Sequence, residues 1–231
     1  MYGLYQCDEL TSKEVHSLSG MLSILPIARG AQLAVVRLPR SVMFGEDSIG
    51  KRASRRSHAR TQAGQAALTA AGCHRAVLGH PNGSRRVWPQ GWTGSLAQGG
   101  DIAVAVVCPL DGDAQLLGVG IDIEPVDSLR FLDRFPRAAF APEESDAFRR
   151  GSGDDGSSIA RFVVKEAVFK CLPNRLQVEY PLRRIVPFAE PLGQGVCYWT
   201  VSVGGIEVEA LSASGNSYFS ALALPVAAVL R

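Results

Sequence analysis

The sequence lacks several features that would assign it to a common class of protein. It contains no run of about 18 apolar residues, so we expect no membrane-spanning helix. It contains no glycine-rich loop ending in Gly-Lys-Ser or Gly-Lys-Thr, which argues against a nucleoside triphosphatase of that type. The first ten residues include Asp8 and Glu9 and do not resemble a secretory signal. The five cysteines form no CxxC pair, and their odd number favours a reduced, cytoplasmic compartment.

Neither charge sign dominates the composition, but the two signs are unevenly distributed. The chain has 24 Lys and Arg against 22 Asp and Glu, a balance that predicts no nucleic-acid partner. Residues 29–86 contain 11 basic residues but only two acids, Glu46 and Asp47, whereas acids concentrate between residues 101 and 155. A basic first half and an acidic centre suit a phosphate-rich ligand that is bridged to a metal ion.

Hydrophobic periodicity predicts a mixture of strands and helices. Apolar and β-branched runs predict strands at 31–38, 102–108, 116–123, 184–188, 195–203, 206–211 and 218–223. Helices are predicted at 51–71, from Pro142 onward, and at 159–172, where Pro173 ends the last one. We expect strands 102–108 and 116–123 to pair as a hairpin with acids at its exit.

Two carboxylates stand at the end of the predicted strand 116–123. Asp122 and Glu124 are two residues apart, so strand geometry places them on one face. Converging carboxylates repel each other unless a cation lies between them, and magnesium prefers a few carboxylates with water and phosphate oxygens. The alternative is a pair of solvated acids at a turn.

A third carboxylate lies on the predicted helix 159–172. Glu166 and Lys170 are four residues apart and share one face of a helix that is otherwise apolar. They could form an ordinary surface ion pair. A carboxylate beside an ammonium group is also what a magnesium–pyrophosphate site requires, because the lysine can stabilise charge on the leaving group.

Three motifs in order resemble those of the 4′-phosphopantetheinyl transferases. They are VWPQGWTGSL at 87–96, GIDIE at 120–124 and FVVKEAVFK at 162–170, and the resemblance covers about residues 50–175. The chain is most similar to the single-chain type that activates surfactin synthetase, and the first motif resembles the enterobactin-like branch. The resemblance implies Mg²⁺-dependent transfer of the phosphopantetheine arm of coenzyme A to a serine of an apo acyl, peptidyl or aryl carrier protein, releasing 3′,5′-ADP.

The resemblance also implies roles for individual residues. Asp122, Glu124 and Glu166 would bind the metal, Glu166 would act as base, and Lys170 would stabilise the pyrophosphate. Lys165 would contact phosphate or the carrier, or be solvated. The remaining candidates for coenzyme A binding are the basic residues of the first half and two positions after the WP motif: Arg52, Arg55, Arg56, Arg60, Arg85, Arg86, Ala97 and Gln98.

The last two of these candidates depart from the family pattern. Family members usually carry Ser or Thr followed by His where this chain has Ala97 and Gln98. A glutamine amide donates a hydrogen bond but carries no charge, and a charge-assisted bond is roughly twice as strong as a neutral one. We therefore expect weaker coenzyme A binding or a compensating arginine.

The implied fold is α+β, a pseudo-dimer of two similar α/β halves with the active site in the cleft between them. We place the halves at 1–112, with the basic helix and the WP motif, and 113–231, with the acids and the KEA helix. A monomer acting in secondary metabolism, such as siderophore or polyketide synthesis, is expected. Two rivals stay open: a non-catalytic or weakened homologue that binds coenzyme A or a carrier, and another magnesium-dependent phosphoryl enzyme.

Overall fold

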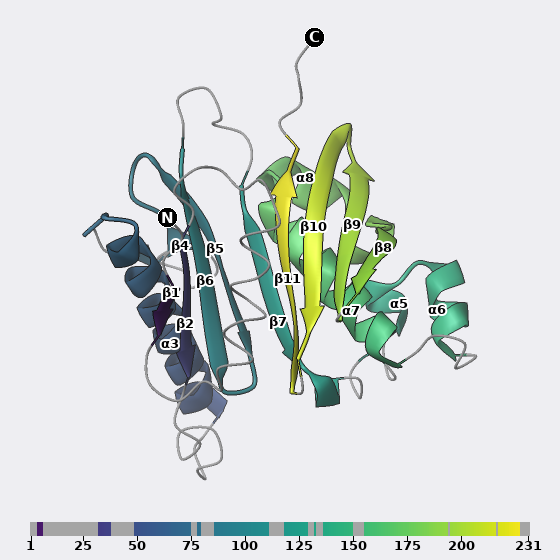
Figure 1. Cartoon of the computed structure of the whole chain (residues 1–231), viewed down its shortest axis with the longest axis horizontal. Helices are drawn as coiled ribbons and strands as arrows, with labels where there is room; N and C mark the ends of the chain where they lie inside the picture. The colour runs from purple at the N-terminus through teal and green to yellow at the C-terminus, as the bar shows by residue number, and fades with distance from the viewer. Residues whose placement is uncertain are drawn as a thin grey trace.

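The computed structural model places two β-sheets side by side, each with a long helix against it (Figure 1). The structure describes residues 4–6, 32–37, 49–74, 78–79, 86–110, 118–128, 132, 136–149, 155–193, 195–215 and 217–226. The expected mixture of helix and strand is confirmed. Within these residues no helix is long and apolar enough to cross a bilayer.

The first sheet has the strand order β1-β2-β6-β5. Its strands are β1 (Leu4–Gln6), β2 (Gln32–Arg37), β5 (Trp92–Gly99) and β6 (Ile102–Pro109). The helix predicted at 51–71 is confirmed as α3 (Ile49–Ala70), and it covers one face of this sheet. Its contact surface consists of alanines at helical spacing, Ala59, Ala63 and Ala67, which are fully buried. Such small side chains let the helix pack closely on the sheet.

Strand β6 forms a hairpin with β5, so the predicted pairing of 102–108 with 116–123 is wrong. Gly99 pairs with Ile102 across a two-residue turn, in which Gly100 has a φ of 53° that favours glycine. The sequence patterns predicted neither β5 nor this tight turn. Strand β7 (Gly120–Pro125) instead pairs with β11 in the other sheet.

The second sheet has the order β7-β11-β10-β9-β8. Strands β9 (Val196–Val203), β10 (Ile206–Ser214) and β11 (Tyr218–Pro225) confirm the predicted C-terminal strands. The predicted strand at 184–188 is wrong, because a 3-10 turn (Leu182–Arg184) precedes the exposed edge strand β8 (Phe188–Gly193). A separate short pair joins β3 (Leu78–Gly79) to β4 (Arg86–Val87).

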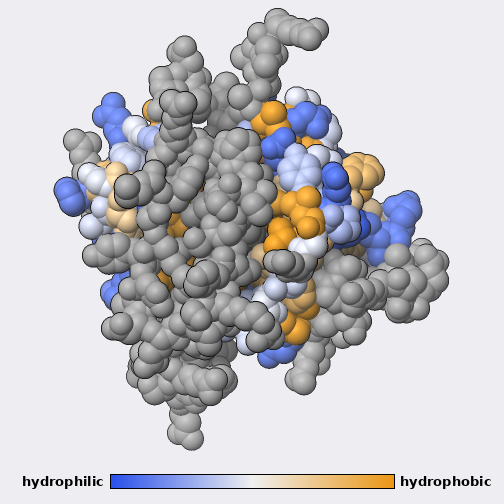
Figure 2. Space-filling model, viewed as in Figure 1, coloured by the Kyte–Doolittle hydropathy of each residue, from blue (hydrophilic) through white to orange (hydrophobic). Residues whose placement is uncertain are grey.

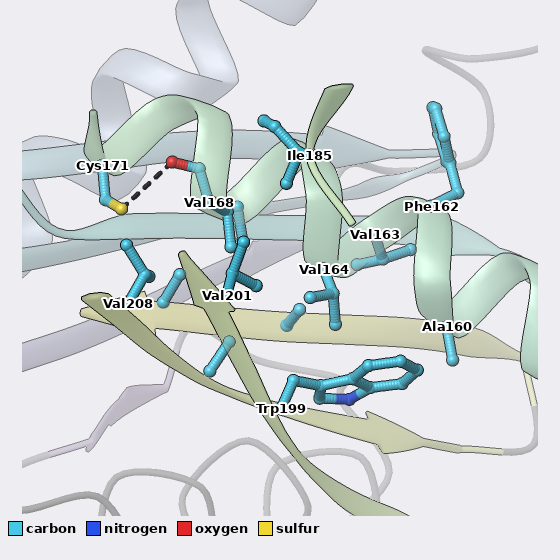
Figure 3. Close-up of a cluster of buried hydrophobic side chains, with 14 of the residues drawn as sticks. Ala160, Phe162, Val163, Val164, Val168, Cys171, Ile185, Trp199, Val201 and Val208 are labelled. Carbon is cyan, nitrogen blue, oxygen red and sulfur yellow. Dashed lines mark hydrogen bonds between the residues drawn. The ribbon is translucent and has the colours of Figure 1, made fainter. Parts of the chain in front are cut away.

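Helices of the C-terminal part cover the second sheet. Helix α7 (Asp155–Cys171) packs along β7, β10 and β11, and α6 (Pro142–Arg149) begins at Pro142 as expected. The shorter elements are α5 (Pro136–Ala139), α8 (Asn174–Glu179) and a 3-10 turn at Val126–Ser128. Figure 3 shows the core beneath α7, where Val164 and Val168 point toward Trp199 and Val201 of β9.

A second apolar core lies between the two sheets. Its members come from β2, β5 and β6 on one side and from β7, β10 and β11 on the other, including Ala97, Val104, Ile121 and Leu211. On the face shown in Figure 2, apolar side chains over the second sheet occur in small groups among polar ones. The continuous core between the sheets fixes where β5 lies relative to the carboxylates of β7.

Candidate active site

Strand β7 directs its two carboxylates toward α7. Ile121 and Ile123 contribute to the core between the sheets, so the alternate residues Asp122 and Glu124 face the other way. Glu124 is paired in register with Phe219, whose side chain lies in the core beneath α7. The side chain of Asp122 is 6% exposed. The alternative of a solvated acid is therefore wrong for Asp122.

Lys170 of α7 reaches across to β7. Its Nζ donates to Asp122 Oδ1 at 2.5 Å and to the Ile121 carbonyl at 3.3 Å. This approach depends on Gly120, where a side chain would overlap the backbone of Ala167 in α7. The Lys170 side chain is 28% exposed, so its ammonium group combines a fixed partner with access to solvent. A lysine on this helix thus meets a carboxylate 48 residues away in the sequence.

Glu166 lies in the electrostatic field of Asp122. Burial raises the pKa of the Glu166 carboxyl, the negative charge of Asp122 raises this pKa further, and the positive charge of Lys170 opposes both effects. The two carboxylates predicted from different motifs are thus brought together with the predicted lysine. Such a group holds a proton more readily than an ordinary glutamate does.

The carboxylate oxygens of this site fit a hard divalent cation. Asp122 Oδ2 is buried and has no hydrogen-bond partner in the part of the chain that the structure describes. An unsatisfied oxygen beside a second carboxylate is the donor set that Mg²⁺ prefers. Glu124 shares the strand face, but the described residues contain no cluster of three Cys, His, Asp or Glu side chains close enough to hold a metal. The structure therefore brings Asp122 together with Glu166 and Lys170. It does not bring the three predicted acids, Asp122, Glu124 and Glu166, into one cluster.

Strand β5 touches β7 through a series of small residues. Ser95 Oγ accepts a hydrogen bond of 3.1 Å from the backbone N–H of Ile121, directly before Asp122. At Gly99, a Cβ would lie only 2.5 Å from the Ile123 carbonyl oxygen. Ala97, between them, is buried in the core between the sheets, so its predicted contact with coenzyme A finds no support. Small residues at alternate positions 95, 97 and 99 were the sequence signal for this contact.

Gln98 lies on the strand face opposite Ala97. Its Nε2 donates to the Gly100 carbonyl at 3.3 Å, and its Oε1 is buried without a hydrogen-bond partner among the described residues. Figure 1 places the β5–β6 turn, the C-terminal end of β7 and the N-terminal end of α3 at one end of the molecule. The strand register places Gln98 next to the β5–β6 turn, and therefore at this end of the molecule.

Only some of the predicted arginines can be placed. Arg56 of α3 is exposed and Arg60 is half-buried. Arg52 and Arg55 lie in α3 and Arg86 lies in β4, but their side chains are outside the described residues, as is the whole of Arg85. Their predicted contacts with phosphate stay predictions.

Lys165 lies apart from the Asp122 site. Its side chain is fully buried, and its Nζ donates to the Ala139 carbonyl at 3.1 Å and to Glu144 Oε2. Burial lowers the pKa of Lys165, whereas the hydrogen bond and charge of Glu144 oppose this shift. A solvated Lys165 is therefore wrong, and its predicted contact with coenzyme A or a carrier finds no support. The sequence interpretation missed its partner Glu144.

A side-chain hydrogen bond also joins the two sheets near the β5–β6 turn. The Tyr218 hydroxyl, at the start of β11, donates to Asp101 Oδ1 in this turn. Gly100 permits the approach, because a Cβ there would lie 3.0 Å from the Tyr218 hydroxyl oxygen. Tyr218 is paired in register with Pro125, the residue after Glu124. No motif identified this pair, which joins residues 117 positions apart.

Comparison with known proteins gives a match, which covers the C-terminal part of the chain. The family model described as ACPS, the 4′-phosphopantetheinyl transferase superfamily, matches residues 118–218. The matched region contains Asp122, Glu124, Glu166 and Lys170, whereas α3 and β5 precede it. Among curated proteins, no match to the chain was found. Residues 118–218 thus carry a domain of this superfamily.

Proposed function

We propose that this chain transfers the 4′-phosphopantetheine arm of coenzyme A to a serine of an apo carrier protein. The observation that supports the proposal most strongly is the meeting of Lys170 and Glu166 with Asp122 inside the region matched by the family model. In the reaction, the serine oxygen forms a bond to the phosphorus that bears pantetheine. The bond from this phosphorus to the bridging oxygen breaks, and 3′,5′-ADP leaves with the electron pair.

Three carboxylates would hold Mg²⁺: Asp122 and Glu124, which share one face of β7, and Glu166 of α7. When bound, the ion supplies charge neutralisation to the pyrophosphate oxygens. Glu166 is the candidate base for the serine proton, because its carboxylate lies beside Asp122 and Lys170, where the serine would approach the phosphate. Lys170 is suited to bind the leaving phosphate, since its partly exposed ammonium group is anchored beside Asp122.

The site would lie between two similar halves, residues 1–112 and 113–231, which form a single-chain pseudo-dimer. The contact of Ser95 with Ile121 supports this proposal, because it joins a strand of the first half to the strand that carries the acids. The exposed Arg56 and the basic end of α3 would offer cations to the 3′-phosphate and pyrophosphate of coenzyme A. One chain then supplies both walls, which favours a monomer.

A second function is favoured by Gln98. Its amide is neutral, and its Nε2 already donates to the Gly100 carbonyl, so it offers a phosphate less than a charged histidine does. A weakened or non-catalytic homologue that binds coenzyme A or a carrier is therefore the alternative. Because the motif at 87–96 resembles the enterobactin-like branch of the surfactin-activator type, we propose carriers of secondary metabolism as the first substrates to test.

The experiment is incubation of the chain with coenzyme A, Mg²⁺ and a panel of apo acyl, peptidyl and aryl carriers, followed by intact-mass analysis of each carrier. We expect at least one carrier to gain the phosphopantetheine arm, and expect EDTA to prevent the gain. Binding of coenzyme A without a mass gain on any carrier would favour the non-catalytic alternative. Release of an ADP-type product from nucleoside triphosphates, but never from coenzyme A, would favour another magnesium-dependent phosphoryl enzyme.

A further inference from the structure

Glu144 of α6 connects to two cations of α7, one helical turn apart. Its Oε2 accepts from the buried Lys165 ammonium, and its Oε1 accepts from Arg161 Nη1 at 3.2 Å. The Glu144 side chain is 12% exposed and that of Lys165 is fully buried, so this ion pair is shielded from water, whereas the Arg161 side chain is 32% exposed. A carboxylate held by two cations in such surroundings has little freedom to reorient.

Glu144 is itself fixed by the start of α6. The backbone N–H of Ala141 donates to Glu144 Oε2 at 2.9 Å, which is the arrangement in which a glutamate in the first turn reaches back to the residue before the helix. Pro142 occupies the first helical position, where a missing N–H has no cost. The carboxylate that binds α7 is therefore fixed to the backbone of its own helix.

The two cations have further partners that fix their positions. Lys165 also donates to the Ala139 carbonyl and lies over the Phe140 ring at 5.2 Å. Arg161 donates to the Pro187 carbonyl at 3.0 Å and lies 5.5 Å above the Trp199 ring. Every one of these groups belongs to a segment outside α7, so together they hold one face of that helix.

Because α7 is rigid, the contacts that hold Arg161 and Lys165 also determine the direction in which Glu166 and Lys170 point. Arg161 and Lys165 are four residues apart, as are Glu166 and Lys170, so each pair occupies one stripe of α7. Successive residues of a helix are about 100° apart, so Lys165 and Glu166 project in different directions. A rotation of α7 about its axis would break the contacts of Lys165 and would at the same time turn Glu166 and Lys170 away from Asp122.

We propose that Glu144 is a positioning residue for the Asp122 site: by holding Arg161 and Lys165, it sets the rotation of α7 that presents Glu166 and Lys170 to Asp122. The inference rests on the proposed function for its chemical meaning, although the geometry can be tested without transfer. Buried ion pairs are poor devices for stability alone, because well-packed apolar residues of similar size often do as well. Their directional bonds are suited to fixing one orientation.

The test measures Mn²⁺ binding by electron paramagnetic resonance and arm transfer for the same set of variants. Glu144→Gln removes the charge of the buried carboxylate, and Glu143→Gln is the matched control, since Glu143 is an exposed neighbour in the same turn. The double variant Glu144→Leu/Lys165→Met replaces the ion pair by apolar residues and guards against loss of folding in the single variant. Urea unfolding reports the stability of each protein.

We expect Mn²⁺ affinity to fall about tenfold in Glu144→Gln and in the double variant, as for residues that orient metal ligands, whereas Glu143→Gln should match the wild type. The transfer rates of both variants should be closer to the wild-type rate at saturating Mg²⁺ than at low Mg²⁺. The proposal is overturned if the double variant folds and binds Mn²⁺ with wild-type affinity, whatever its stability, since the Glu144–Lys165 ion pair would then not position the metal ligands. A wild-type chain that binds no Mn²⁺ also overturns it.

Failure of the proposed function gives a different result. A wild-type chain that binds Mn²⁺ but modifies no carrier would remove the transferase proposal, and the Mn²⁺ affinities of the variants would still decide the role of Glu144.

Discussion

Replacing Gly120 by alanine should separate α7 from β7 and take the Asp122 site apart. An added Cβ would lie 2.8 Å from the Ala167 carbonyl carbon and closer still to its oxygen, whereas ordinary contacts begin near 3.4 Å. Both atoms belong to backbone and cannot rotate away, so α7 would have to move by about 1 Å or more to restore van der Waals separation. The Lys170–Asp122 hydrogen bond of 2.5 Å would then exceed bonding distance or be distorted.

The expected cost follows from overpacking of a rigid contact. We expect the free energy of unfolding to fall by about 3 kcal/mol, the upper part of the usual range for inserted groups. For a chain of this length each kcal/mol lowers Tm by about 2–4 °C, so Tm should fall by roughly 6–12 °C. Urea and thermal unfolding measure both quantities.

Gly118→Ala is the matched control for this substitution. Its Cβ would lie 3.1 Å from the Cys171 carbonyl oxygen, close to the end of the same helix, where a shift of a few tenths of an ångström suffices. We expect a loss of less than about 1 kcal/mol and little change in activity. Equal stability of Gly120→Ala and the wild type would refute the packing of α7 on β7 and, with it, the placement of Lys170 beside Asp122.

Three further substitutions test individual groups. Glu166→Gln should stabilise the metal-free protein near neutral pH but not below about pH 4. The pKa of Glu166 is higher in the folded than in the unfolded chain, so its ionisation at neutral pH favours unfolding, whereas at low pH the carboxyl is neutral in both states. A gain of equal size at both pH values in urea unfolding would contradict this. Asp122→Ala should abolish transfer while far-ultraviolet circular dichroism stays that of a folded chain, and wild-type activity would refute the metal assignment. Gln98→His should tighten coenzyme A binding in isothermal titration calorimetry, and unchanged or weaker affinity would show that another group binds the phosphate.

Local patterns predicted those parts of the site that depend on periodicity. The two-residue period of β7 placed Asp122 and Glu124 on one face, and the helical period of α7 placed Glu166 with Lys170. Neither pattern contains the distance between the two elements. That distance depends on Gly120, whose importance appears only when α7 packs on the strand.

The errors have a common physical origin in contacts between distant residues. Lys165 was expected to contact phosphate or the carrier, or to be solvated, because its counter-ion Glu144 lies 21 residues away on another helix and no local pattern reveals it. The pairing of β6 was assigned to the next apolar run, although the short turn at Gly100 joins it to β5. Ala97 was assigned to ligand binding by motif position, whereas the contact between β5 and β7 buries it.

The central claim is that the group formed by Asp122, Glu166 and Lys170 transfers phosphopantetheine. Its most direct test is the rate at which an apo carrier gains the arm, followed by intact mass with coenzyme A and Mg²⁺, for the wild type and for Lys170→Met. We predict modification by the wild type and a rate at least about 100-fold lower for Lys170→Met, the usual scale for loss of a group that stabilises transition-state charge. Unmodified carriers with the wild type, or equal rates for both proteins, would contradict the claim.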